Sequence, residues 1–190
     1  MRKISNLYNK ILFLSSLITL FLCVFSYLIN AHFNSFQFLM FFISLILPIL
    51  LKRIFSINVN TKMLLIYLLF LILHFIFGEI LNFYVKYLYY DTFLHFFSSF
   101  VIAYFVNELV NDKCKFNILF SFMVAISCEF FWEIFEYTID EFFLTNMQRY
   151  IKDGIKLVGH LDIKDTIKDM VVATLGGFSF IVYMKVKKWR

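Results

Sequence analysis

Acidic residues stand at helical spacing inside one of the most apolar stretches of the chain. In the segment CEFFWEIFEY, residues 128–137, Glu129, Glu133 and Glu136 are separated by four and then three positions. An α-helix would place their carboxyl groups within about 60° of one another on one face. A carboxylate at the centre of a membrane helix costs roughly 2.5–3.5 kcal/mol, so three unpaired ones cost on the order of 10 kcal/mol. We therefore expect these acids to have partners, protons or water.

Candidate partners lie in two other segments of the sequence. YYDTFLHFF contains Asp91 and His95 four positions apart, and LDIKDTIKDM contains Asp162, Asp165 and Asp169 at spacings of three and four. Imidazole and carboxylate groups that converge in a partly desolvated cavity suit zinc, manganese, magnesium or iron. The sequence thus predicts a site with a divalent metal as its candidate cofactor. The candidate metal ligands are Asp91, His95, Glu129, Glu133, Glu136, Asp165 and Asp169.

Three of these residues are the candidates for catalysis. Glu133 would act as a base or ligand, His95 as a ligand or proton shuttle, and Asp169 as a ligand. The sequence contains neither the H-E-x-x-H motif nor the Glu-x-x-His pair of di-iron bundles. Two other interpretations stay open. The acids and histidine could relay protons or cations, or they could hold the helices together in a protein that only binds an envelope partner.

The composition is that of an integral membrane protein. Of 190 residues, 62% are hydrophobic and 22% aromatic, and no polar stretch is long enough for a separate soluble domain. We therefore predict one transmembrane domain, 1–190, in contact with membrane lipids. The net charge of +5 is read as a signal of orientation rather than of nucleic-acid binding. Three scattered cysteines encode neither a disulfide framework nor a thiolate zinc site.

Apolar windows predict an all-α polytopic bundle of about six helices, because about 20 helical residues cross a bilayer. The segment between the last two predicted helices, 138–165, is predicted to be an outer loop that serves as a lid over the acids or as a plain connector. The predicted spans are 10–30, 35–51, 62–80, 92–110, 116–137 and 166–184.

Basic residues predict the orientation of these spans. Twelve Lys and Arg residues fall on the side that holds both termini, and six fall on the other. By the positive-inside rule, the N and C termini are predicted to be cytoplasmic. All four histidines and most acids then fall midway or outward, which predicts one outward-facing acidic site. An outward site that borders lipid favours an envelope lipid or lipid-linked substrate.

Three motifs in order, YYDTFLHF, EFFWEIFEY and DTIKDMVVATLGG, resemble the uncharacterised YjdF-like bacterial inner-membrane proteins, and more distantly the VanZ-like family linked to glycopeptide resistance. The resemblance covers roughly residues 75–180, and the third motif is its most distinctive part. It implies a multi-pass protein of the bacterial inner membrane and carries no settled reaction. Asp169 stands where the VanZ-like pattern has Asn, and Glu136 stands where Gln is typical. The oligomeric state is not predicted.

Overall fold

The chain folds into two compact units, Met1–Tyr90 and Asp91–Arg190, called unit 1 and unit 2 below. The computed structural model describes residues 2–28, 35–57, 59–110, 116–143, 145–148, 151–152, 155–156, 158 and 163–188. Each unit is described by itself. The predicted single transmembrane domain, 1–190, stays a prediction.

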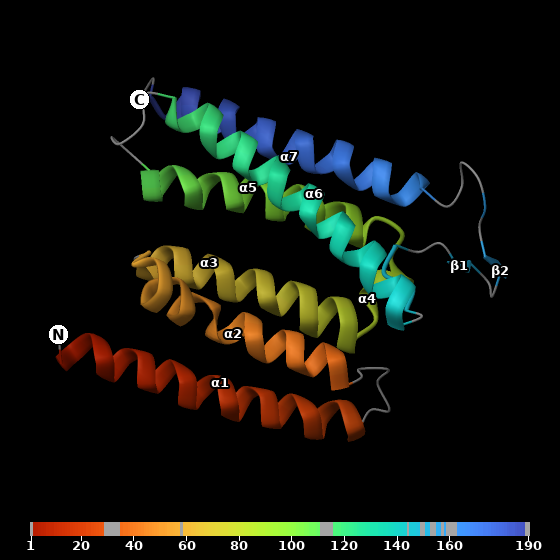
Figure 1. Cartoon of the computed structure of the whole chain (residues 1–190), viewed down its shortest axis with the longest axis horizontal. Helices are drawn as coiled ribbons and strands as arrows, with labels where there is room; N and C mark the ends of the chain where they lie inside the picture. Colours follow the sequence, from red (N-terminus) through yellow and green to blue (C-terminus); the bar gives the residue numbers. More distant parts are fainter. Residues whose placement is uncertain are drawn as a thin grey trace. The chain divides into compact units, whose positions relative to one another are not determined.

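Unit 1 is made of helices (Figure 1). Asn60 starts the third helix by accepting a hydrogen bond from the Met63 main-chain nitrogen at 2.9 Å, which satisfies a free N–H group of the first turn. That helix passes directly into a π-helix. Buried Leu22, Phe41 and Phe75 belong to an apolar core that joins the first, second and π-helices. The helices are α1 (Arg2–Leu28), α2 (Ser35–Phe55), α3 (Thr61–Leu71), the π-helix η1 (Ile72–Ile80) and α4 (Phe83–Lys86).

Unit 2 is built from three long helices, α5 (Tyr90–Val110), α6 (Asn117–Phe143) and α7 (Lys164–Lys188). Figure 1 shows them as three long neighbouring ribbons, and α6 packs against α7. Glycine permits the close approach of α7 to α5: a Cβ on Gly176 would collide with the main-chain carbonyl of Phe96. Small residues allow this type of close packing between membrane helices. A hairpin of two short antiparallel strands, β1 (Ile151–Lys152) and β2 (Ile155–Lys156), precedes α7.

The predicted all-α transmembrane class is confirmed. Within the residues searched, five helices are long and apolar enough to cross a membrane. They correspond to the second through sixth predicted spans. Helix α1 covers most of the first predicted span, 10–30, whose last two residues lie outside the described part of the chain. The five candidate spans are Gln37–Phe55, Thr61–Ile80, Tyr90–Val110, Asn117–Phe143 and Lys164–Lys187.

The predicted outer loop, 138–165, differs from the structure in two ways that matter for the site. Helix α6 continues to Phe143, six residues beyond the predicted end at 137, so the segment predicted as a loop begins later. The hairpin of β1 and β2 also lies within the predicted loop 138–165. The last turns of α6 continue to bury one face, since Ile139 and Asp140 are both buried. This buried face extends the helix past the apolar window that marked its predicted end.

Candidate metal centre

In the middle of helix α6, two acids are buried while neighbouring aromatic side chains are exposed. Glu129 and Glu133 are each 5% exposed, whereas Phe130 and Phe131 are 45% and 66% exposed. This is the polarity expected of a membrane helix, because lipid accepts the aromatic face and the carboxylates need partners inside the bundle. The two glutamates are thereby directed towards α5 and α7.

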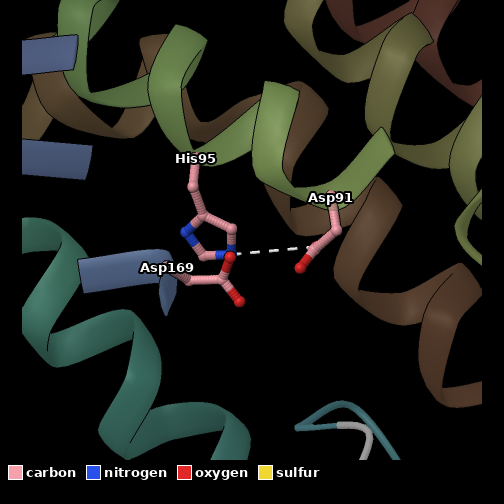
Figure 2. A group of neighbouring side chains, drawn as sticks. All are labelled: Asp91, His95 and Asp169. Carbon is pink, nitrogen blue, oxygen red and sulfur yellow. Dashed lines mark ion pairs between the residues drawn. The ribbon is translucent and has the colours of Figure 1, made fainter. Parts of the chain in front are cut away.

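Three buried residues from two helices bring their ligand atoms together. Asp91 and His95 lie one turn apart near the start of α5, and Asp169 lies in the second turn of α7. One ligand atom from each lies within 4.8 Å of the other two. Figure 2 shows both carboxylates near the same edge of the His95 ring, with the ion pair to Asp91 dashed. We call Asp91, His95 and Asp169 the three-ligand cluster.

The two ring nitrogens of His95 face different carboxylates. Nδ1 lies 3.0 Å from Glu129 Oε2, and the Ser98 hydroxyl donates to Glu129 Oε1 at 2.6 Å. Nε2 lies 3.7 Å from Asp91 Oδ1 and 3.9 Å from Glu133 Oε1. An ionised Glu129 can only accept, so Nδ1 donates to it, and in the neutral imidazole the lone pair is then on Nε2, the nitrogen that faces the cluster. Histidines that bind a metal through one ring nitrogen commonly donate the N–H of the other ring nitrogen to a carboxylate in this way.

Two carboxylate oxygens in this region are buried without a hydrogen-bond partner among the described residues, Glu133 Oε1 and Asp169 Oδ1. The ammonium of Lys168 lies 3.4 Å from Asp169 Oδ1, and it also pairs with Asp165. Buried polar atoms nearly always have partners, so two such oxygens beside one imidazole call for a proton, water or cation. The carboxylates of Glu133 and Asp169 could therefore bind a cation at these oxygens.

The remaining predicted ligands lie beside the three-ligand cluster rather than in it. Glu129 and Glu133 contact opposite nitrogens of His95. Glu136 is half-buried and accepts a hydrogen bond from Trp132 Nε1 at 2.7 Å on its own helix. Asp165, in the first turn of α7, pairs with Lys168. Asp162 lies outside the described residues.

Four polar residues around the site were not predicted from the sequence. Ser98 follows His95 by three positions, and Asp140 continues the Glu129, Glu133, Glu136 spacing by four more, so periodicity could have found both. Gln148 and Thr166 form a hydrogen bond of 2.9 Å between the segment after α6 and the start of α7. No local pattern in the sequence signals that contact, because it joins residues 18 positions apart.

Further along the bundle of unit 2, the buried polar side chains are neutral. Ser99, Asn107 and Ser121 are each at most 2% exposed. The acids of the site therefore gather at the end of unit 2 where α5 and α7 begin.

The apolar outer surface, the buried acids and the five candidate spans together define an integral membrane protein. Residues 11–190 match the model of the family described as "Predicted membrane protein (DUF2238)", and the chain belongs to this family. It is also similar to an uncharacterised protein of Thermotoga maritima, with 32% identity over 121 residues. That match covers 60% of this chain and 57% of the relative, so the chain spans somewhat more than half of the relative's length. No solved structure matches the chain.

Proposed function

We propose that unit 2 binds one divalent metal ion through His95 Nε2, Asp91 and Asp169, and uses it in acid/base chemistry. The observation that carries this proposal is the approach of three buried ligand atoms to within 4.8 Å of one another. Two ligands about 2.1 Å from one ion lie at most about 4.2 Å apart. In tetrahedral geometry the two ligands would lie about 3.4 Å apart, so the widest pair would close by up to about 1.4 Å, which side-chain rotations can provide.

The contacts around the cluster support distinct roles for its neighbours. Glu129 orients His95 through Nδ1, as outer carboxylates do for metal-binding histidines. Glu133 faces the same nitrogen as Asp91 and has a buried free oxygen, which suits a fourth ligand or a general base. A bound divalent ion would activate water or polarise a carbonyl or phosphoryl oxygen.

The depth of the site supports an amphiphilic substrate. His95 and Asp169 are each the sixth residue of their helix, about 8 Å from its first residue at helical rise. A bilayer of about 40–45 Å has a hydrocarbon core of about 30 Å, so this depth is near the boundary between headgroups and acyl chains. We propose a lipid or lipid-linked envelope substrate whose polar group reaches this level, and a location in the bacterial inner membrane.

The YjdF-like resemblance agrees with membership of the predicted membrane protein family, and the VanZ-like resemblance stays a prediction. A purely structural role for the acids has one observation in its favour, the pairing of Lys168 with Asp165 and Asp169. That pairing leaves the buried Glu133 Oε1, 3.9 Å from His95 Nε2, without a hydrogen-bond partner among the described residues, whereas a metal ion bound at Nε2 would engage it.

Metal analysis of the purified protein tests the proposal. We expect about one zinc, manganese, magnesium or iron ion per chain in the wild type and a large loss in Asp169→Asn, because a carboxylate ligand is removed. Glu141→Gln is the matched control, since Glu141 is an exposed acid on α6. A wild-type protein without stoichiometric metal, or an Asp169→Asn variant that keeps all of it, contradicts the proposal.

A further inference from the structure

A buried aspartate at the end of α6 holds the segment that follows it. Asp140 is 3% exposed, and it accepts hydrogen bonds from the Thr145 hydroxyl, the Met147 main-chain nitrogen at 2.8 Å and the Gln148 main-chain nitrogen at 2.9 Å. An acid near a helix C-terminus is disfavoured by the helix dipole, so these donors must offset a cost. Asp140 thus fixes residues 145–148 rather than stabilising its own helix.

The segment held by Asp140 reaches towards the metal centre. The Gln148 side chain donates to the Thr166 hydroxyl at 2.9 Å. Thr166 in turn lies within hydrogen-bonding reach of the Glu133 carboxylate. A hydroxyl has one proton and two lone pairs, so a Thr166 that accepts from Gln148 keeps its proton for Glu133. The side chains of Gln148 and Thr166 thus form a chain of two donors that ends at the Glu133 carboxylate, and Asp140 holds the main chain of Gln148 at its start.

We infer that Asp140 is a positioning residue for Glu133, acting through Gln148 and Thr166. This inference rests on the proposed function, in which Glu133 is a base or ligand. The chain of donors holds the Glu133 side chain in place as an acceptor, while its Oε1 stays directed towards His95 Nε2 at 3.9 Å. The hydrogen bond between Gln148 and Thr166 also joins the segment after α6 to the start of α7. In this inference, residues 145–148 help to position Glu133 and are more than a plain connector.

Two measurements test the inference without metal. Hydrogen exchange reports on the main-chain amides of Met147 and Gln148, and we expect faster exchange in Asp140→Asn, because half of the carboxylate acceptors are removed. Infrared spectroscopy reports on Glu133, whose carboxylate band is assigned by its loss in Glu133→Gln. We expect that band to shift in both Asp140→Asn and Thr166→Val, and to keep its position in Thr166→Ser.

The matched controls are Glu141→Gln, the exposed acid beside Asp140, and Thr174→Val, an exposed threonine of the same helix as Thr166. Neither is expected to move the Glu133 band. A band that shifts in Thr166→Val but not in Asp140→Asn overturns the role of Asp140, and so does unchanged exchange at Met147.

Titration with Mn²⁺ then separates this inference from the proposed function. We expect both Asp140→Asn and Thr166→Val to weaken Mn²⁺ binding by about 10-fold, the lower range for residues that support a ligand. The double variant is expected to be no weaker than Thr166→Val alone, because both changes break one chain. A wild type that binds no Mn²⁺ overturns the proposed function, while the exchange and infrared results still decide the role of Asp140.

Discussion

The two nitrogens of His95 divide the surrounding carboxylates into two groups. Glu129 contacts Nδ1, whereas Asp91 and Glu133 face Nε2. In our account Glu129 orients the ring, Asp91 and Asp169 hold the ion together with His95, and Glu133 is a fourth ligand or a general base. A residue that orients a ligand changes affinity, while the ligand itself decides whether the ion binds at all.

This division predicts graded effects on Mn²⁺ binding, measured by the electron paramagnetic resonance signal of free Mn²⁺. We expect Glu129→Gln to weaken binding by about 10- to 100-fold, because the ring loses its orienting acceptor, and His95→Asn to weaken it more. Glu136→Gln is the matched control, since Glu136 is held by Trp132 on its own helix. Equal affinity in Glu129→Gln and wild type contradicts the orienting role.

For these residues, the sequence predicted that acids and a histidine lie together. It did not predict which carboxylate orients the imidazole ring and which ones bind the ion. The spacing of Glu129 and Glu133 was enough to place both on a buried face. It could not assign Glu129 to Nδ1, because that depends on the rotation of an imidazole about its own side-chain bonds. Asp140 was missed because the helix was predicted to end at 137, three residues before it.

Close packing of α7 against α5 keeps Asp169 beside Asp91 and His95. Gly176, about two turns further along α7 than Asp169, has the main-chain carbonyl of Phe96 where a Cβ would stand. Gly177 has the side-chain ring of Phe122 in the corresponding position, 2.9 Å away. A backbone carbonyl within a helix cannot move aside, whereas a ring at the end of a side chain can rotate.

The two glycines therefore give a matched pair of substitutions. We expect Gly176→Ala to destabilise the protein by about 1–3 kcal/mol through overpacking, and Gly177→Ala to destabilise it less. Thermal unfolding in detergent measures both. We also expect Gly176→Ala to weaken metal binding, because separation of α7 from α5 moves Asp169 away from His95. A larger loss of stability in Gly177→Ala contradicts this account of the packing.

Among the elements, long apolar windows were predictable and local departures from α-helical geometry were not. The predicted span 62–80 corresponds to one candidate membrane span, yet its second half is the π-helix η1. Apolar composition is the same in both helix types, so hydropathy carries no signal for the change. The hairpin of β1 and β2 is formed by two residues in each strand, too few for a strand pattern in sequence.

The whole molecule is predicted to have both termini on the cytoplasmic side, from the distribution of Lys and Arg alone. Single cysteines test this in a background without Cys23, Cys114 and Cys128. Three predicted spans separate Lys62 from Lys152, so these positions are expected on opposite sides.

We expect Lys152→Cys to react with a membrane-impermeant maleimide on intact cells, and Lys62→Cys to react only after the membrane is permeabilised. The same reagent on permeabilised cells shows that both cysteines are reactive. The reverse pattern would place the site on the cytoplasmic side and remove the argument for an envelope substrate. Labelling of both from outside would contradict the number of spans between them.

The central claim is that His95 holds a divalent ion, and pulsed electron paramagnetic resonance of the Mn²⁺-loaded protein tests it most directly. A nitrogen bound to Mn²⁺ modulates the electron spin echo. Our account predicts one histidine nitrogen in the wild-type signal and none in His95→Asn loaded with Mn²⁺ at higher concentration. His74, which hydrogen-bonds Tyr84 in unit 1, stays in both proteins as an internal control. A wild-type signal without nitrogen, or a nitrogen signal that persists in His95→Asn, would contradict the account.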